Sequence, residues 1–492
     1  MAPTVERDAT DALVRDLADA GFTAGGVSAF LGAPAAGALA RFSPAPALAV
    51  CEARPGHPLA TLVRLLWLGM PVPLDEAASA LPALGPEGLS TLGLASSDGT
   101  ALTPSSVVRS HRLHAGSGFI EMLIASDLDE LSGIHPLRDD HVLGVGGAAR
   151  TLLATLPDGR LGRALDLGTG CAVVAIALAE RADSVVATDI SERAIRYAKL
   201  NAALNSIDSI DFRLGSLYEP VAEEQFDLIA SNPPFIISPR TDAGRYEYRD
   251  AGMRGDALMQ IVLEGSDEHL RPQGHLRMLG NWEDGAERAS SWVPGGLSGL
   301  VIERERLDPA RYAEIWTRDG GTPPASEDGI RRIGSWVADF AERDVESVSF
   351  GWFALQRSPG GVRVESLQHP IALEGVSASL SLALREIADP ALDEELLGSM
   401  LVASPDITES RHARPGAAGP NVIELRQGGW LQRTVQTDTA FAAFVGACDG
   451  TLTAGQIAEV LASLLEVDAD ALRIQLLEQV REGLRTGMLL RD

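Results

Sequence analysis

The sequence predicts an α/β protein whose central domain is a mainly parallel sheet covered by helices on both faces. Three observations predict it. The buried strand 163–167 (RALDL) runs into a glycine turn and then into an apolar helix. The strand 184–188 ends in an acid, Asp189, and the strand 226–230 ends in the rigid corner Asn-Pro-Pro-Phe, 232–235. Strands that alternate with helices in this way form parallel sheets buried on both faces.

The alternation of strands and helices continues beyond these three strands. Ser191 is the expected N-cap of the helix that follows Asp189. Near the end of the domain, the Ser-Pro-Gly-Gly turn at 358–361 predicts a hairpin that forms an antiparallel edge. The other expected elements are the strands 211–214, 274–280 and 298–303 and the helices 171–181, 192–205, 255–270, 283–293, 308–317 and 329–342.

Length, charge and cysteine content limit the class of protein. A chain of 492 residues exceeds what one compact core holds, so we expect several domains. The formal net charge of −27 argues against a protein that grips phosphate backbones over a broad surface. Three widely spaced cysteines, Cys51, Cys171 and Cys448, indicate a reducing compartment and neither a disulfide framework nor a metal site. No stretch has the apolar core of a signal peptide or a membrane span, which predicts a cytoplasmic protein without a membrane partner.

Residues 1–115 are expected to form a helical, winged-helix-like N-terminal domain. Three helix candidates precede a hairpin around the turn SSDGT at 96–100. Nucleic-acid binders share this pattern, but residues 57–115 hold three arginines against four acids. We therefore favour a packing or substrate-covering module over a DNA reader. The three helix candidates are 58–67, 73–81 and 86–94.

The central domain is expected to span 116–370, and its first segment, 116–156, to supply a lid or a wall of the pocket. Residues 371–492 are expected to form a second winged-helix-like domain, with a flexible joint at 410–421. Residues 385–492 carry nine arginines and seventeen acids, a net charge of −8, which favours a partner-docking module over a nucleic-acid binder. Its expected elements are a hairpin at 421–435 and the helices 438–447, 453–465 and 469–486.

The glycine turn and the acid that follows it predict a nucleotide-type pocket at the carboxyl edge of the sheet. Gly168 and Gly170 let the backbone approach a ligand closely. An acid about twenty residues after such a turn, here Asp189, accepts hydrogen bonds from ribose hydroxyls.

These features, together with the Asn-Pro-Pro-Phe corner, resemble the class I S-adenosylmethionine-dependent methyltransferases. Over residues 140–365 the chain looks most like the branch that methylates planar amino groups, which holds the release-factor glutamine methyltransferases and related adenine-N6 and guanine-N2 enzymes. The resemblance implies a seven-stranded Rossmann-like core, S-adenosylmethionine as cofactor and methyl transfer to nitrogen. It implies cofactor binding by Asp166, Leu167, Gly168, Thr169, Gly170, Asp189, Ile190, Ser216, Leu217 and Asn232, and catalysis by Asn232, Pro233, Pro234 and Phe235.

The Asn-Pro-Pro-Phe corner suits the methylation of an amide or amino nitrogen, whose lone pair is delocalised. If the Asn232 side-chain oxygen and the Pro233 carbonyl accept its N–H groups, the nitrogen rehybridises and aims its lone pair at the sulfonium methyl. Two prolines hold the carbonyl rigidly because their φ angles are fixed. Phe235 offers an aromatic face to a planar substrate.

The chain departs from the family pattern at three places. Ala172 stands where the cofactor loop has its third glycine, and Ser216 stands where an acid usually faces adenine. The Pro-Arg-Pro segment of the glutamine methyltransferases is absent from 141–150. A weaker similarity to their Gly-Gly-x-Asp-Gly-Leu stretch lies at 248–258, where Tyr248, like the nearby Tyr246 and Arg249, is read as a surface or packing residue.

Purely structural interpretations remain open at this stage. The glycine turn could be only a tight turn, Asp189 a helix cap, Asp166 a brace for the loop backbone and the proline corner a rigid loop. For the acceptor, a protein glutamine or another amide is favoured because of the acidity of the chain. An RNA or DNA amino base, a small metabolite and a non-catalytic scaffold are the alternatives.

Overall fold

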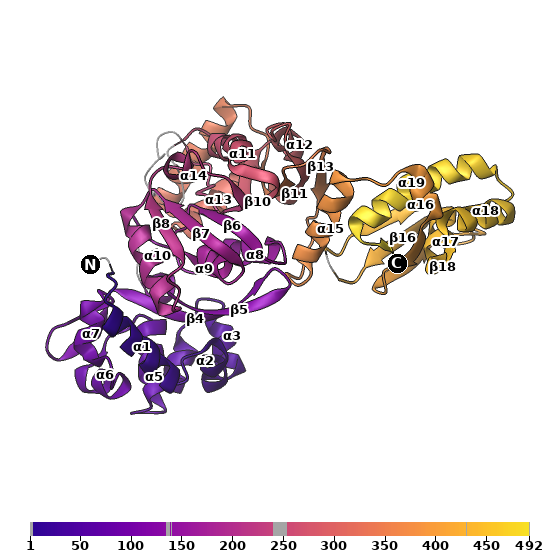
Figure 1. Ribbon diagram of the computed structural model, residues 1–492. Helices are drawn as coiled ribbons and strands as arrows, with labels where there is room; N and C mark the ends of the chain where they lie inside the picture. The colour runs from indigo at the N-terminus through magenta and orange to yellow at the C-terminus, as the bar shows by residue number, and fades with distance from the viewer. Residues whose placement is uncertain (1–2, 134–137, 139, 240–252, 430, 492) are drawn as a thin grey trace.

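A computed structural model describes residues 3–133, 138, 140–239, 253–429 and 431–491 of the chain. Three parts follow one another along the chain and in space (Figure 1). The N-terminal part lies on one side of the central sheet, and the C-terminal part lies at the far end of the molecule. The helix α15 (Val376–Ala388) lies between the central and the C-terminal part.

The central part is built on an eight-stranded sheet with the order β13-β11-β12-β10-β9-β6-β7-β8. Its strands from β8 to β10 run parallel, whereas β12 runs antiparallel to both of its neighbours. This mostly parallel sheet confirms the expected α/β class and Rossmann-like core, to which β13 adds an eighth strand. The strands are β6 (Leu161–Leu167), β7 (Ala182–Asp189), β8 (Ile210–Leu214), β9 (Phe226–Ser231), β10 (Leu270–Glu283), β11 (Ser298–Leu307), β12 (Val348–Gln356) and β13 (Val362–Ser366).

Helices cover both faces of this sheet. Neighbouring residues of one strand point to opposite faces, so that Ala164 and Leu228 contact the core under α8, α9, α10 and α15, whereas Leu165 and Ile229 contact the core under α11 and α12. Ser191 caps α10 as expected, because its side chain accepts the Ala194 N–H. The helices are α8 (Gly147–Thr155), α9 (Val173–Ala179), α10 (Glu192–Leu204), α11 (Ala257–His269) and α12 (Ala286–Ser290).

The prediction of a hairpin around the Ser-Pro-Gly-Gly turn is wrong. The strand β13 does not pair with β12; it runs parallel to β11, with Gly299 opposite Val362. The reason is that both edges of β12 are already occupied by β10 and β11. The turn therefore carries the chain across to the outer edge of β11.

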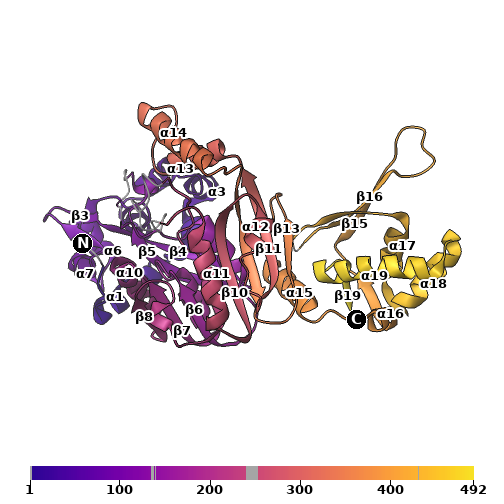
Figure 2. The same ribbon diagram turned by 90° about the horizontal axis from the view of Figure 1, so that it is seen from above.

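Between β11 and β12 the chain leaves the sheet to form two packed helices, α13 (Pro309–Asp319) and α14 (Glu327–Glu342). Figure 2 shows this pair standing out from one end of the central strands. Asp308 and Ser326 cap the two helices through their side chains.

The N-terminal part contains the expected helices and hairpin. Its small sheet has the order β1-β3-β2, and Asp98 closes the turn between β2 and β3 by accepting the Thr100 N–H at 2.8 Å. None of the helices in the described ranges is both long and apolar enough to cross a lipid bilayer. The elements are α1 (Arg7–Asp19), α2 (Ala24–Leu31), α3 (Ala33–Leu39), α4 (Ala45–Glu52), α5 (Pro58–Leu62), the π-helical turn Val63–Trp67, β1 (Val72–Pro73), α6 (Leu74–Ala80), α7 (Gly85–Thr91), β2 (Ala95–Ser97) and β3 (Ala101–Pro104).

A long hairpin of β4 (Ser106–Ala115) and β5 (Gly118–Asp127) joins the N-terminal part to the central part. The side-chain amide of Asn201, on α10, accepts the Ala125 N–H at 2.7 Å and donates to the Ala125 carbonyl at 2.9 Å. Helix α10 thus binds the edge of β5 as another strand would. The expected domain boundary at 115 and 116 falls in the turn of this hairpin.

The C-terminal part has two three-stranded sheets, with the orders β18-β14-β19 and β15-β16-β17. The expected hairpin at 421–435 is present as the antiparallel pair β16 and β17. The elements are α16 (Asp393–Gly398), β14 (Met400–Ala403), β15 (Ile407–His412), β16 (Val422–Gln427), β17 (Thr434–Thr437), α17 (Thr439–Ala447), β18 (Asp449–Thr453), α18 (Ala454–Leu465), α19 (Ala469–Thr486) and β19 (Leu489–Arg491).

A buried cluster of charges fastens the C-terminal part to the central sheet. Glu365, on the edge strand β13, pairs with Arg433 at 2.9 Å and with Arg485 of α19. All three side chains are at most 11% exposed. Buried pairs of this kind are destabilising to break, because the remaining charge has no partner.

Candidate active site

The expected cofactor turn and the proline corner begin at paired residues of neighbouring strands. Leu167 ends β6 and lies opposite Thr188 of β7 on one side and Ser231 of β9 on the other. The Ser231 hydroxyl donates to the Leu167 carbonyl at 2.8 Å. The loops that follow β6, β7 and β9 therefore leave the sheet side by side at its carboxyl edge, which is where such sheets bind ligands.

The glycine turn has the open, left-handed backbone that glycine allows. Gly168 and Gly170 have φ angles of 78° and 54°, and a Cβ atom at either would meet nothing within 4 Å. The N–H groups of Gly168 and Thr169 both donate to the Thr188 carbonyl at 2.9 Å. The turn is thus fixed to β7 on one side and faces open space on the other.

Asp166 braces this turn from beneath. Its carboxylate accepts the Thr169 hydroxyl at 2.6 Å and the Ala175 N–H at 2.9 Å, and the residue is 2% exposed. Burial raises the pKa of Asp166 to about 7, against which the two hydrogen bonds act. This geometry supports the bracing interpretation, and a direct contact between Asp166 and the cofactor stays a prediction.

Asp189 stands at the end of β7, beside the turn. Its carboxylate accepts the Gly170 N–H and the Ser191 N–H, each at 2.8 Å. The next side chain, Ile190, is 68% exposed, so an apolar surface is open beside the acid. The backbone of Gly215 donates to the Asp189 carbonyl at 3.0 Å, which brings the half-buried Ser216 and Leu217 to the same edge.

Ala172, in place of the third glycine, occupies a left-handed position. Its φ angle is 65° and it is completely buried at the N-terminus of α9. A residue with a Cβ atom is sterically disfavoured in this conformation, which explains why the family has glycine at this position. The sequence alone did not predict the left-handed backbone.

The proline corner follows β9 directly. Pro233 is buried and Phe235 is half-buried, where it contacts the cores on both faces of the sheet. The Asn232 Oδ1 atom is buried and accepts no hydrogen bond within the part of the chain that the structure describes. An unpartnered buried amide oxygen is costly unless a ligand supplies the donor, so this atom fits the binding of an N–H group.

Residues 144–293 match the family described as "Methyltransferase small domain", and residues 19–105 match a "Domain of unknown function (DUF7059)". The first of these matches lies within the central part and covers less than a third of the chain. This match confirms the resemblance found in the sequence and the expected enzyme class, a methyltransferase. The expected cofactor, S-adenosylmethionine, is confirmed at the level of this family.

Relatives with curated names are similar to part of the chain. The release factor glutamine methyltransferase of Xylella fastidiosa (strain Temecula1) is 41% identical over 153 residues, which are 29% of this chain and 55% of the relative. The same enzyme of Aliivibrio fischeri is 34% identical over 151 residues, which are 29% of this chain and 53% of the relative. The chain thus spans about half the length of the curated relatives it matches.

Solved structures of methyltransferases are similar to part of this chain at low overall scores. The 16S rRNA N2 G1207 methyltransferase of T. thermophilus is 18% identical, with a TM-score of 0.26, and the match covers 48% of this chain and 61% of that one. The ribosomal protein L11 methylase of Lactobacillus delbrueckii is 28% identical, with a TM-score of 0.22, over 28% and 62% of the two chains. The family assignment therefore depends on the sequence match.

The methyltransferase domain fits a nucleoside cofactor at its carboxyl edge. The open space before Gly168 and Gly170, the carboxylate of Asp189 and the exposed side chain of Ile190 lie together there. They offer backbone groups, a hydrogen-bond acceptor and an apolar face, which are what a nucleoside requires. The ten predicted cofactor residues keep their roles as predictions.

One contact at this edge was not foreseen from the sequence. The N–H of Ile237, two residues past Phe235, donates to the Tyr312 hydroxyl at 3.0 Å. Tyr312 lies on α13, and no local pattern in the sequence joins that helix to the proline corner. The stretch 248–258, expected to be similar to the glutamine methyltransferases, is described only from residue 253 on, and Tyr246, Tyr248 and Arg249 lie outside the described residues. In the described part of the stretch, the buried Asp256 pairs with Arg288.

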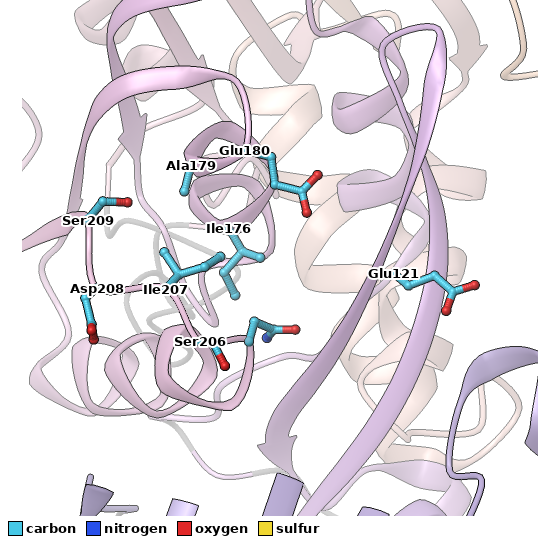
Figure 3. Close-up of a pocket in the computed structure, with 9 residues that line it drawn as sticks. Glu121, Ile176, Ala179, Glu180, Ser206, Ile207, Asp208 and Ser209 are labelled. Carbon is cyan, nitrogen blue, oxygen red and sulfur yellow. The ribbon is translucent and has the colours of Figure 1, made fainter. Parts of the chain in front are cut away.

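A separate hollow of about 470 Å³ lies at the amino edge of the sheet (Figure 3). It is bounded by the end of α9, the loop 205–209 and Glu121 of β5. None of the predicted site residues lines it. Because catalytic groups of such sheets lie at the carboxyl edge, we assign this hollow no role in the reaction.

Proposed function

We propose that this protein is an S-adenosylmethionine-dependent N-methyltransferase whose acceptor is the side-chain amide of a protein glutamine. The proposal depends above all on the pairing of Leu167 with Ser231, which puts the cofactor turn beside the proline corner. The names of the relatives, release factor glutamine methyltransferases, support this acceptor class.

The cofactor would be held by the turn 168–170 and by Asp189. When bound, it supplies an electrophilic methyl group on a sulfonium centre. The turn offers backbone groups at close range, and the Asp189 carboxylate would accept hydrogen bonds from ribose hydroxyls. Ile190, which is exposed beside the acid, would cover one face of the adenine.

The acceptor nitrogen would be oriented by the proline corner. Asn232 Oδ1 and the Pro233 carbonyl accept the two N–H bonds of the amide, which directs the nitrogen lone pair along the line of attack. Among the described residues Asn232 Oδ1 accepts no hydrogen bond, so none of the bonds seen there has to break when the substrate binds. Holding two reactants in line contributes roughly 7–11 kcal/mol to the lowering of a barrier.

No strong base is required before the attack, because the amide nitrogen is neutral. Asp166 is buried beneath the turn with its carboxylate bound to Thr169 and Ala175, so it serves the loop and not the acceptor. The corner is therefore an orienting device, and the methylated nitrogen loses one of its protons to solvent after the transfer.

The charge of the chain supports a protein acceptor over a nucleic acid. The formal net charge is −27, and residues 385–492 alone carry −8. A nucleic-acid substrate would be repelled by such a surface unless a local basic track compensated.

The test is transfer of a labelled methyl group from S-adenosylmethionine to a purified bacterial peptide-chain release factor. We expect label in the wild-type factor and none in a factor whose acceptor glutamine is replaced by asparagine. A parallel incubation with total RNA and with a deproteinised small-molecule extract tests the other acceptors. Label only in RNA or only in a metabolite would refute the protein acceptor. If calorimetry detected no cofactor binding, the enzymatic function itself would be refuted in favour of a non-catalytic scaffold.

A further inference from the structure

The two inserted helices contact the loop that follows the proline corner. The hydroxyl of Tyr312, on α13, accepts the Ile237 N–H at 3.0 Å. Both Tyr312 and Ile237 are buried, at 0% and 2% exposure. A buried N–H has to find an acceptor, so this bond fixes the loop end to α13 rather than to the sheet.

The same hydroxyl also binds Asn281, on the strand next to β9. The Asn281 side-chain N–H donates to it at 3.0 Å, and Asn281 is 1% exposed. Asn281 lies three residues beyond Met278, the residue of β10 that pairs with Ser231. Tyr312 therefore joins the end of β10 to the loop that leaves β9.

The Tyr312 ring is itself held from several sides. Its centroid lies 5.7 Å from that of Trp336, 5.9 Å from that of Phe340 and 5.5 Å from that of Phe350. The loop residue Ile236 packs against the same aromatic cluster. Both inserted helices and β12 thus form a rigid platform for the hydroxyl, and its position is set before any ligand binds.

We propose that Tyr312 and Asn281 are positioning residues that hold the proline corner in the geometry required for methyl transfer. The inference deepens the function proposed above and depends on it. The loop leaves β9 at Ser231, forms a β-bridge at Phe235 and is bound again at Ile237, so Asn232 lies on a segment that is held at both ends. If the second tie is lost, the corner keeps its sequence but not its fixed placement.

The buried amide of Asn281 adds a second reason to assign a role to this pair. Its Oδ1 atom accepts no hydrogen bond within the described part of the chain. If the amide is turned over, the Nδ2 atom is left without a partner instead. In a purely structural core asparagine, the amide oxygen and the amide nitrogen normally both have hydrogen-bond partners. The Asn281 amide therefore binds the Tyr312 hydroxyl at the expense of local stability.

The test compares Tyr312→Phe with a matched control, Tyr197→Phe. Each replacement removes one buried hydroxyl and keeps the ring. The Tyr197 hydroxyl binds Ser106 and Asp127 at 2.8 Å, at the junction with the N-terminal part and away from the proline corner. Three readouts are measured on the full chain: kcat and KM for the release factor, Kd for S-adenosylmethionine by calorimetry, and hydrogen exchange of the Ile237 amide by NMR.

We expect Tyr312→Phe to lower kcat by about 10–100-fold, because a displacement of 1 Å at a reacting group costs about 100-fold. KM and the cofactor Kd should stay within about threefold of wild type, and the Ile237 amide should exchange at least tenfold faster. Asn281→Ala should act in the same direction. Tyr197→Phe should lower the melting temperature and leave kcat and the Ile237 amide unchanged.

Two outcomes would overturn the inference. The first is an unchanged Ile237 exchange rate in Tyr312→Phe, a result that does not require any acceptor and so is independent of the proposed function. The second is an equal fall in kcat in Tyr312→Phe and Tyr197→Phe, which would indicate general destabilisation. A wild-type protein that binds the cofactor but methylates no release factor would instead refute the proposed acceptor.

Discussion

The Asp189 carboxylate accepts the Gly170 N–H at 2.8 Å, so the acid that ends β7 holds the turn that follows β6. Its other oxygen accepts the Ser191 N–H at the same distance. Two interpretations of Asp189, a helix-capping acid and a cofactor-binding acid, are therefore compatible. The acid shapes the turn and caps the helix, and its contact with a ribose hydroxyl stays a prediction.

We predict that Asp189→Ala weakens cofactor binding by about 10–100-fold, since hydrogen bonds to a charged group contribute about 1.5–3 kcal/mol. Calorimetric titration with S-adenosylmethionine measures the change. Asp189→Asn, which keeps one acceptor oxygen, should lose less. An alanine variant that binds the cofactor as tightly as wild type would leave Asp189 with the capping role alone.

Asn232→Ala should have the opposite profile. It removes the buried amide oxygen of the proline corner, which has no partner among the described residues, and leaves the turn 168–170 intact. Turnover should therefore fall by at least ~100-fold while the cofactor Kd changes by less than threefold. The methyl-transfer assay and the calorimeter together measure both quantities. Equal loss of binding and turnover in Asn232→Ala and Asp189→Ala would show that the two roles are misassigned.

The site could be predicted from the sequence where the signal is local. Gly168, Gly170 and Asp189 follow strands at a spacing that a nucleotide pocket requires, and the corner at Asn232 is contiguous. The structure brings these residues to one edge because parallel strands end together. Tyr312 could not be found in this way, because it reaches Ile237 across 75 residues and has no motif of its own.

The prediction of a hairpin at 358–361 was wrong because it, too, depended on contacts between distant residues. The turn 358–361 is a valid turn signal, but it carries no information on which strand edge is free. Both edges of β12 are occupied along its whole length, one by β10 and the other by β11. The left-handed backbone of Ala172 could not be predicted either, because an alanine at this position indicates only that a small side chain fits.

The buried Asp166 should make the stability of the methyltransferase domain depend on pH. Burial raises the pKa of Asp166 from 3.8 to about 7, so the folded state binds a proton that the unfolded state loses. Stability should therefore fall as the pH rises from about 4 to about 7 and should then level off. Asp166→Asn can keep both hydrogen bonds on one oxygen, because Thr169 and Ala175 donate to the same carboxylate atom.

Melting temperatures of wild type and Asp166→Asn, measured at intervals from pH 5 to pH 8, give the comparison. We expect the difference between the two proteins to shift in favour of the variant as the pH rises to 7 and to stay constant above it. Parallel curves over the whole range would show that Asp166 has an ordinary pKa in the fold.

Ala172→Gly should be nearly neutral, in contrast to other buried Ala→Gly changes. The left-handed backbone of Ala172 costs about 1–2 kcal/mol that glycine avoids, which offsets a buried methyl group of about 0.8 kcal/mol and the greater entropy of glycine. We expect the unfolding free energy to stay within ~1 kcal/mol of wild type. Ala177→Gly is the control, because Ala177 is equally buried but lies inside α9, and it should lower the unfolding free energy by about 2 kcal/mol. Denaturant titration measures both variants, and a similar loss in the two would contradict the argument.

Glu365→Gln should loosen the attachment of the C-terminal part. It leaves Arg433 and Arg485 buried without their shared carboxylate, and removing one partner of a buried pair costs about 3–5 kcal/mol. Burial alone would raise the pKa of Glu365, but the two arginines hold it below the ordinary value of 4.5. The stabilisation should therefore be fully present above pH 4.5 and disappear as the pH falls through the lowered pKa.

The matched control is Glu459→Gln, which removes a pair with Arg473 in which the Glu459 side chain is 66% exposed. Surface pairs contribute about 0–1 kcal/mol, so this variant should behave as wild type. Limited proteolysis at pH 7 compares how fast the chain is cut between the central and C-terminal parts, and only Glu365→Gln should be cut faster. If its excess sensitivity did not shrink as the pH fell through the lowered pKa of Glu365, the charge of Glu365 would not be what holds the junction, because wild type loses the same charge over that range.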